Sequence, residues 1–506
     1  MTAIDPRTPC IIGVATHTWH PENVGEVGAP EPLEMWEHVA RLAERDAGRP
    51  EVLRVLDSVQ IVYCQTWEYD DAVARLATRL GADPRHRHYS GIGGTTTQQL
   101  VNATSEAMLR GEMELALVTS AEALATKRLR KRQGVRYEAS FAPAERSPFP
   151  WESPPDPVEV AHEVFQAWLT FAVFDNARRA HLGVGLDEYR TRIGEMLAPM
   201  TQIAARNPRA WYRVERTPSE IVDATPDNRM VGYPYTKYMV AVMDVDMAGA
   251  LLLATHGKAD DLGIPLDRRV YPRGWCYARD PVLVAAHPDL ASSPAMAAAS
   301  AEALRIAGVS VDDVAYFDLY SCFASSLHFA CDALGLQPGD ARGLTVTGGL
   351  PYHGGPASGY LTHSIAEMVE RLRAEPAATG LVSGVGMHMT KHVYGAYSGS
   401  PGPVTPPDAS GVQATVDRAG SVELVAEYEG RATVAAYSVV HGRDGAPEWA
   451  LLVCDLPGGG RTYAQARAAE LCTDAETTEL VGRAVTLKTE TVDGPMGTAR
   501  VNLATW

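Results

Sequence analysis

Hydrophobic positions along residues 1–124 alternate between two spacings. The segments "PCIIGVAT" and "DSVQIVYC" are short and nearly continuously apolar, which predicts buried strands. By contrast, "LEMWEHVARLAERDA" and "DDAVARLATRLGA" repeat apolar residues at helical spacing. A Gly-rich turn, "GIGGTTT", then leads into the helical pattern "TQQLVNATSEAMLRG", and "ELALVTSAEAL" follows as a further strand. Strands that alternate with helices predict an α/β fold.

The same order of elements returns in residues 258–398. The pair "VDDVAYFDLYSC" and "ACDALGL" repeats the strand, loop and helix of "VLDSVQIVYC" and "ARLATRLGA". Likewise, "HGGPASGYLTHSIAEMVERLRA" repeats the Gly-rich turn and helix of residues 91–111, and "ATGLVSGVGM" repeats the strand after it. Self-similarity at roughly 260 residues predicts two related halves. An active site between them would receive one turn from the same place in each half.

Three further regions depart from this pattern. Residues 125–230 are basic, proline-rich and aromatic around the helical segments "PVEVAHEVFQAWLTFAVFDNARRAHL" and "LDEYRTRIGEMLAPMTQIAARNP", which predicts an insertion of helix and loop. We therefore assign residues 1–124 together with 231–257 to the first half. Residues 399–411, "GSPGPVTPPDASG", have the composition of a linker. Residues 412–506 contain short strands joined by turns, which predicts a small all-β domain, a barrel.

Composition narrows the class of protein. The chain has 506 residues, a formal net charge of −17 and 46% hydrophobic residues, so we expect several packed domains and neither nucleic acid nor a membrane as partner. The apolar run "YMVAVMDVDMAGALLLAT" carries two aspartates and is too short to span a bilayer. The N-terminal sequence lacks the pattern of a signal peptide, and the seven cysteines contain no C-x-x-C pair, which favours the cytoplasm.

Metal and nucleotide motifs are sparse. His388 and His392 form H-x-x-x-H, the spacing of two metal ligands on a helix, but no glutamate follows the first histidine as it does in the zincin motif. We therefore predict no metal site. The alternative for His388 is a place at the rim of the active site. The sequence has no Walker A loop, no strand–G-x-G-x-x-G–helix fingerprint and no G-x-S-x-G elbow.

Five segments resemble the thiolase superfamily, in the order in which that family has them. Residues 91–111 resemble the loop and helix that carry the thiolase nucleophile, and 227–253, "DNRMVGYPYTKYMVAVMDVDMAGALLL", resemble actinobacterial thiolase-like proteins. Residues 318–336 resemble the "HDCF" segment of sterol-carrier-type thiolases, 346–360 the "GHP" segment and 380–387 the final "CxG" strand. The resemblance covers about residues 8–398. It implies two α/β halves in an α/β/α/β/α arrangement, a loop domain at 125–230 that binds the CoA nucleotide, and an OB-like C-terminal domain.

The catalytic residues of thiolases are mostly missing. Aligned by these segments, the nucleophilic cysteine falls on Gly94, the "GHP" histidine on Gly355 and the "CxG" cysteine on Val382. Thiolases use the thiolate to divide a difficult acyl transfer into two easier steps, which a glycine cannot do. We therefore expect no ordinary acetyl-CoA acetyltransferase activity, although the family is one of acyltransferases.

Other parts of the thiolase site have counterparts. The resemblance implies an oxyanion hole from the backbone N–H groups of Gly94 and Gly384. Cys322 keeps the cysteine of "HDCF", and Tyr320 replaces its histidine, so both are candidate acid or base groups. His353 lies two residues before the lost "GHP" histidine and is a candidate replacement. For each of these side chains the alternative is an ordinary packing role.

The basic stretch "KRLRKRQGVR" stands out in an acidic chain. The resemblance places it where the loop region binds the CoA nucleotide, and guanidinium groups suit phosphates. A solvated basic loop is the alternative. The candidate CoA ligands are Lys127, Arg128, Arg130, Lys131 and Arg132.

Three functions remain open from the sequence. The first is an enzyme that acts on acyl-CoA without a cysteine nucleophile, by aldol or retro-aldol chemistry of lipids or steroids. The second is a non-catalytic CoA-ester-binding protein, and the third is a scaffold. None of them requires a cofactor, since the CoA thioester is ligand or substrate. The family implies a homodimer, but the stretch "DPRHRHYS" would place like charges face to face across a two-fold axis, so a monomer is the alternative.

Overall fold

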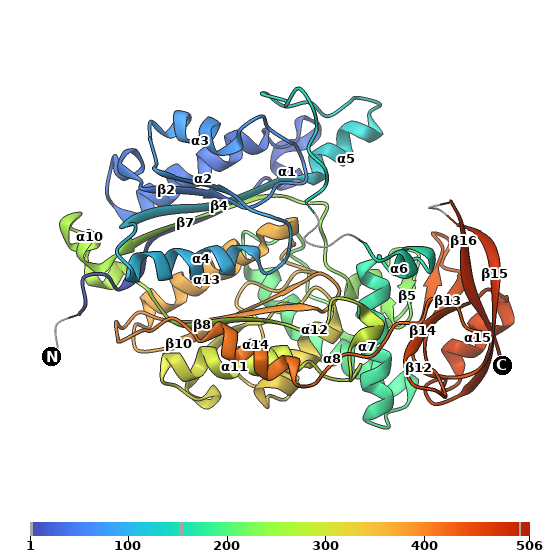
Figure 1. Cartoon of the computed structure of the whole chain (residues 1–506). Helices are drawn as coiled ribbons and strands as arrows, with labels where there is room; N and C mark the ends of the chain where they lie inside the picture. The colour runs from blue at the N-terminus through green and yellow to red at the C-terminus, as the bar shows by residue number, and fades with distance from the viewer. Residues whose placement is uncertain (1–3, 151–154, 495–496) are drawn as a thin grey trace.

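Two sheets organise the larger part of the molecule, a computed structural model that describes residues 4–150, 155–494 and 497–506 (Figure 1). The first sheet has the order β1-β7-β4-β2-β3, in which β7 runs antiparallel to β1 and β4 while β2 runs parallel to both of its neighbours. The strands of this sheet are β1 (Pro9–Thr18), β7 (Asp246–Thr255), β4 (Leu115–Ala123), β2 (Ser58–Ile61) and β3 (His86–Tyr89). The exposed strand β3 forms one edge.

The second sheet repeats this arrangement with four strands. Its order is β8-β11-β10-β9, with β10 parallel to β9 and antiparallel to β11. The strands are β8 (Tyr271–Arg279), β11 (Lys391–Ser398), β10 (Thr379–Gly386) and β9 (Val314–Asp318). Each sheet therefore contains strands from its own half of the predicted repeat.

Helices fill three layers around the two sheets, and Figure 1 shows α4 and α13 between them. One outer layer covers the first sheet with α2 (Pro32–Ala47) and α3 (Ala72–Leu80). The central layer contains α4 (Thr96–Leu109) and α13 (Tyr360–Ala374), and the other outer layer contains α11 (Pro294–Ala307), α12 (Ala324–Leu334) and α14 (Ala409–Asp417). Two small helices, α1 (Pro21–Val24) and α10 (His256–Asp261), lie beside the first half. The predicted α/β/α/β/α thiolase fold is confirmed.

Polar side chains tie the central helix α4 to the second half. Thr97 lies 3.3 Å from Thr362 of α13 by their hydroxyl oxygens, and the Gln98 amide oxygen accepts a hydrogen bond of 2.7 Å from the Tyr397 hydroxyl of β11. All four side chains are buried. Buried polar groups are stable when they are hydrogen-bonded, which explains why so polar a helix lies in the centre of the molecule.

The predicted insertion contains helices and loops, but one helix predicted in it is interrupted. Its helices are α5 (Leu124–Arg132), α6 (Pro157–Ala161), α7 (Ala167–His181), α8 (Leu186–Arg206) and α9 (Pro218–Val222). The pattern of residues 157–182 predicts one continuous helix, but the chain breaks between α6 and α7, where Glu163 adopts a φ of 62°. A left-handed residue cannot continue an α-helix. The predicted linker, residues 399–411, ends earlier in the structure. Asp408 caps the N-terminus of α14, so the helix begins within the predicted linker.

The C-terminal domain is a closed five-stranded barrel. Strand β12 pairs with both β13 and β15, and the remaining pairs β13–β14, β14–β16 and β15–β16 complete the circle. The barrel contains β12 (Gly430–His441), β13 (Pro447–Asp455), β14 (Arg461–Ala466), β15 (Ala484–Gly494), β16 (Gly497–Thr505) and the helix α15 (Ala469–Thr477). Strands β5 (Met230–Gly232) and β6 (Tyr235–Thr236) extend its sheet beyond β12. The predicted small all-β domain is confirmed.

Helix α7 joins the barrel to the rest of the molecule. The buried Arg179 guanidinium donates two hydrogen bonds to the Glu479 carboxylate, at 2.5 and 2.8 Å, and the Asn176 amide donates at 2.9 Å to the Tyr437 carbonyl of β12. The preceding Arg178 is bound in turn to Asp332 of α12. Within the described ranges, no helix is long and apolar enough to cross a membrane.

Removal of the Glu479 carboxylate is expected to weaken this junction. Glu479→Ala leaves the Arg179 guanidinium, 2% exposed, without its partner, and we expect a loss of about 2–3 kcal/mol because the stranded charge is desolvated. The measurement is the midpoint of unfolding in calorimetry. Glu427→Ala is the matched control, since its pair with Arg500 is about half exposed on both sides and should change stability by less than about 1 kcal/mol. Equal effects of the two substitutions would contradict a buried junction.

Candidate active site

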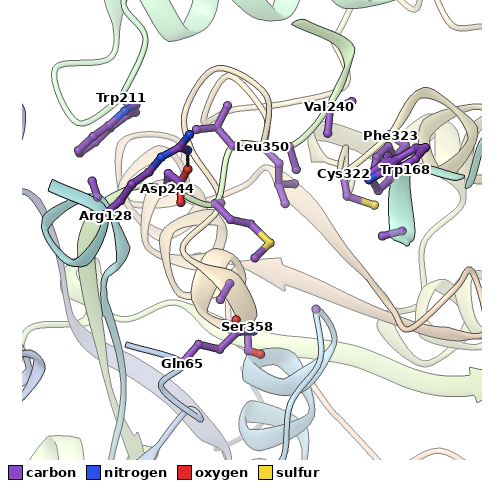
Figure 2. Close-up of a pocket in the computed structure, with 18 of the residues that line it drawn as sticks. Gln65, Arg128, Trp168, Trp211, Val240, Asp244, Cys322, Phe323, Leu350 and Ser358 are labelled. Carbon is purple, nitrogen blue, oxygen red and sulfur yellow. Dashed lines mark hydrogen bonds and ion pairs between the residues drawn. The ribbon is translucent and has the colours of Figure 1, made fainter. Parts of the chain in front are cut away.

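A cavity of about 1100 Å³ opens between the two halves and the helical insertion. Its wall includes the Gly-rich turn before α4, the helices α5 and α7, residues 240–244, the loop after β9 and the 3-10 turn η7 (Ala357–Gly359). In Figure 2, Arg128, Asp244 and Trp211 lie toward one end of the cavity, and Cys322, Phe323, Trp168 and Val240 toward the other. Each half thus contributes a Gly-rich turn to one cavity, as the repeat predicts.

Gly94, the position predicted to correspond to the thiolase nucleophile, has no room for a side chain. A Cβ atom built on Gly94 would lie closer than 3.0 Å to both the Val385 carbonyl oxygen and the Tyr320 hydroxyl. Real Cβ atoms essentially never approach other atoms so closely. The ring of Tyr320 therefore occupies the space beside Gly94, and the glycine is what permits it.

Tyr320 enters the cavity from the loop after β9. Its backbone N–H donates to the Ser383 hydroxyl at 2.9 Å, and its ring packs edge-on against Tyr360 with centroids 5.6 Å apart. Burial raises the pKa of Tyr320. Among the described residues its hydroxyl has no hydrogen-bond partner, so a ligand in the cavity is free to bond it.

The second glycine of the predicted oxyanion hole lies directly behind the first. A Cβ on Gly384, in β10, would be 2.9 Å from the Gly94 carbonyl oxygen, so the two backbones are in contact. Gly94 borders the cavity, whereas Gly384 is absent from its wall and its neighbour Val385 is present. The N–H of Gly93 donates to the Ser358 hydroxyl at 3.0 Å, which joins the two Gly-rich turns.

Cys322 lies in the wall of the cavity, as the resemblance implies. Its thiol donates a weak hydrogen bond of 3.6 Å to the Ser326 hydroxyl, and its backbone carbonyl accepts one of 3.0 Å from Ala241. Burial raises the pKa of the thiol to about 12. At neutral pH the group is therefore a thiol rather than a thiolate, which suits a proton donor and not a nucleophile.

His353 does not lie with Tyr320 and Cys322. It is buried outside the cavity wall, with Nδ1 3.1 Å from the Gly354 carbonyl oxygen and its ring 5.3 Å from that of His363. Burial lowers its pKa to about 4. The sequence suggests His353 only because it lies two residues before the position of the "GHP" histidine. In the structure, the turn directs its side chain into the protein interior.

His388 supplies the cavity with an imidazole instead. It lies in the turn between β10 and β11 and not on a helix, and its neighbours Met387 and Met389 have φ angles of 55° and 60°. Left-handed non-glycine residues cost about 1 kcal/mol or more each, so the surrounding structure holds this turn firmly. The other histidine of the H-x-x-x-H motif, His392, is buried in β11 and pairs with Asp280 at 3.1 Å.

The Thr170 hydroxyl is a hydrogen-bond partner of His388. Its oxygen is 2.9 Å from His388 Nδ1 and 3.1 Å from the Ala167 carbonyl oxygen. When Thr170 donates its single proton to Ala167, it accepts from Nδ1–H, and Nε2 is unprotonated. Burial lowers the pKa of His388 to about 4. A neutral imidazole with a free Nε2 is a proton acceptor.

The five predicted CoA ligands on α5 are divided between two faces of that helix. Arg128 and Arg132, one turn apart, border the main cavity, and Arg128 forms an ion pair with Asp244. Lys127 and Lys131 border a second cavity of about 620 Å³. Arg130 lies in neither wall and donates to the Val27 carbonyl at 2.9 Å.

An alanine at position 94 is expected to destabilise the protein. Its methyl group would press against the Val385 carbonyl and the Tyr320 ring, and overpacking of this kind costs about 1–3 kcal/mol. Gly91→Ala is the matched control, because a Cβ at Gly91 of the same turn meets nothing within 4 Å. The free energy of unfolding of both variants measures the difference. A neutral Gly94→Ala would show that Tyr320 moves aside at no cost.

Known proteins share both the fold and the C-terminal domain. The family model for the additional C-terminal domain of thiolase-like protein type 1 matches residues 411–491. A solved structure of a monomeric SCP2-thiolase-like protein type 1 from Mycobacterium smegmatis is 30% identical over 99% of this chain and 100% of that one, with a TM-score of 0.84. A search of curated proteins gave no match.

More distant structures share the fold alone. An acetyl-CoA acetyltransferase from Syntrophomonas wolfei is 13% identical over 79% of this chain and 100% of that one, with a TM-score of 0.57. An aldolase described as Ltp2-ChsH2(DUF35) is 15% identical over 79% of this chain and 100% of that one, with a TM-score of 0.60. With a relative at 30% identity across nearly its full length, the chain belongs to the SCP2-thiolase-like protein type 1 family of the thiolase superfamily.

Proposed function

We propose that this protein binds an acyl-CoA thioester in the main cavity and acts on it without an acyl-enzyme intermediate. The observation that carries the proposal is the close packing of Tyr320 and the Val385 carbonyl around Gly94. A glycine carries no nucleophile and no side chain fits at that position, which supports a reaction without a covalent step there. Gly94, Tyr320 and Cys322, which the thiolase resemblance assigns to the thioester site, all border the same cavity.

Two features of the turn suit a thioester carbonyl. Gly94 borders the cavity, and the helix α4 begins two residues later at Thr96, so its N-terminal dipole favours negative charge there. One backbone donor aimed at a developing oxyanion contributes about 3–4 kcal/mol where such donors have been removed. Polarisation of the carbonyl therefore does not require a cysteine.

The proton-bearing groups favour retro-aldol cleavage of a 3-hydroxyacyl-CoA over simple binding. His388 Nε2 accepts the proton of the 3-hydroxyl group while the C2–C3 bond breaks. The electron pair of that bond passes to the thioester as an enolate, which the turn at Gly94 stabilises. The Tyr320 hydroxyl or the Cys322 thiol then protonates C2. The products are a shortened acyl-CoA and a carbonyl compound, and the fold does occur in a protein described as an aldolase.

We also propose that the protein is a monomer. The relative from Mycobacterium smegmatis is described as monomeric. In this chain the edge strand β3 is exposed and contains His86, Arg87 and His88, so pairing with a second copy would oppose like charges.

Calorimetric titration tests the binding site. We expect CoA and acyl-CoAs to bind in the micromolar range and Arg128→Ala/Arg132→Ala to weaken binding about tenfold or more, because the two guanidinium groups border the main cavity. Lys127→Ala/Lys131→Ala removes the same charge from the face of α5 that borders the second cavity and is the control. Equal losses in both double variants would mean that only net charge matters. No binding of any ester would leave the fold as a scaffold.

The pH dependence of turnover tests the proposed base. Cleavage is followed by release of the carbonyl product from a 3-hydroxyacyl-CoA. Because the pKa of His388 is lowered to about 4, the imidazole is neutral above that value, and we expect kcat to stay level from pH 8 to about 5 and to fall near pH 4. His388→Gln should lose at least about 100-fold in kcat and this acid limb. A limb near pH 6.5, or one that persists in His388→Gln, would exclude His388 as the base.

A further inference from the structure

One end of the main cavity is almost entirely apolar. Figure 2 shows Trp168, Phe323 and Val240 gathered around Cys322, away from Arg128 and Asp244. Phe171 stacks on Phe323 at 4.6 Å between ring centroids, which closes that side of the space. We call this end the acyl chamber and define it by Phe165, Trp168, Phe171, Val231, Val240 and Phe323.

The chamber suits hydrocarbon. All six of its defining side chains are apolar or aromatic, and the titratable groups Cys322, Lys237 and His388 line other parts of the same cavity wall. A charged or strongly polar acyl group would lose its hydration there without gaining partners. A hydrocarbon chain gains from the same burial, by about 0.8 kcal/mol for each methylene.

Strand β5 of the barrel sheet forms part of the chamber wall. Val231 lies in the wall, and the next residue, Gly232, pairs with Val440 of β12. A Cβ on Gly232 would lie 2.5 and 2.8 Å from the Cε3 and Cζ3 atoms of Trp168. The indole ring of Trp168 therefore packs directly on the backbone of β5. The same side chain also lines the chamber.

Helix α7, which carries Trp168 and Phe171, is fixed to the barrel as well. Asn176 and Arg179 bind β12 and Glu479 two to three turns beyond Trp168. Both β5 and α7 are thus held by the C-terminal domain. A change in the position of the barrel relative to the two halves would therefore move the wall of the chamber.

We propose that the chamber binds a large apolar acyl group of the CoA thioester, and that Trp168, held against Gly232 by the C-terminal barrel, sets the length of acyl group that fits. The proposal rests on the proposed function, because it assumes that the CoA portion enters from the Arg128 end. It gives the barrel a role in specificity rather than in the chemistry. Free fatty acids share the hydrocarbon and lack the CoA portion, so the test includes them.

The test is calorimetric titration of wild-type protein with CoA, with straight-chain acyl-CoAs of increasing length and with palmitate. We expect affinity to rise by about fourfold for each added methylene until the chamber is full, and then to level off. Trp168→Ala should move the plateau to longer chains and Trp168→Phe should move it less. Gly232→Ala should press the indole into the chamber and move the plateau to shorter chains. Affinity for CoA itself should not change in any of these variants.

A control separates the clash from general damage to the barrel. Gly458→Ala adds the same methyl group to an exposed barrel turn where a Cβ meets nothing within 4 Å, so it should leave every affinity unchanged. If Gly232→Ala does not fold, the two Trp168 variants still decide the question, because their substitution removes atoms rather than adding them.

The outcomes distinguish this inference from the proposed function. Binding of CoA with no dependence on acyl length, or a plateau that Trp168→Ala does not move, would overturn the chamber and leave the CoA site standing. Binding of palmitate with no binding of CoA would overturn the proposed function and support the chamber as a fatty-acid site. If the chain length at which affinity levels off increases in Trp168→Ala and decreases in Gly232→Ala, both the acyl chamber and the proposed CoA-ester site are supported.

Discussion

The two halves of the molecule meet where the backbone of the Gly94 turn lies against β10. At this contact a Cβ atom on Gly384 would lie 2.9 Å from the Gly94 carbonyl oxygen, which is shorter than van der Waals contact, so both residues must be glycine for the halves to approach so closely. The same approach brings Val385 and Tyr320 against the turn. The shape of the cavity wall and the position of the Tyr320 hydroxyl beside Gly94 both depend on this contact.

The fold is largely readable from the sequence because its periodicities are strong. Apolar strands, amphipathic helices and the internal repeat predict two related α/β halves, each with a Gly-rich turn before a helix, and the family resemblance adds the five-layer arrangement. The break between α6 and α7 is not predictable from the sequence, because a glutamate such as Glu163 rarely adopts a left-handed conformation. The polar face of α4 is likewise understandable only once its partners in the other half are known.

The candidate site is less predictable because its parts come from distant segments. Gly94, Tyr320 and Cys322 follow from aligned motifs, and the cavity brings them together. His388 replaces His353 in the wall because of the turn after β10, whose shape no spacing rule conveys. The sequence does not predict that the basic side chains of α5 divide between two cavities, because the division depends on where the helix lies in the fold. The apolar wall from α7 and β5 had no sequence signal, since aromatic residues on a helix most often pack in a core.

The adjacent arginines of α7 give this helix an unusual position in the molecule. Arg178 is bound to Asp332 in the second half, and Arg179 is bound to Glu479 in the barrel. Ion pairs therefore attach this one helix to both the second half and the barrel. Fusion of the barrel in the same chain fixes its ratio to the two α/β halves at one to one. In evolutionary terms, a lineage that exchanges or reseats the C-terminal domain can alter the far wall of the cavity while the turn at Gly94 stays as it is. Under the proposed function, selection on the size of the acyl group and selection on the reaction then act on separate parts of one gene.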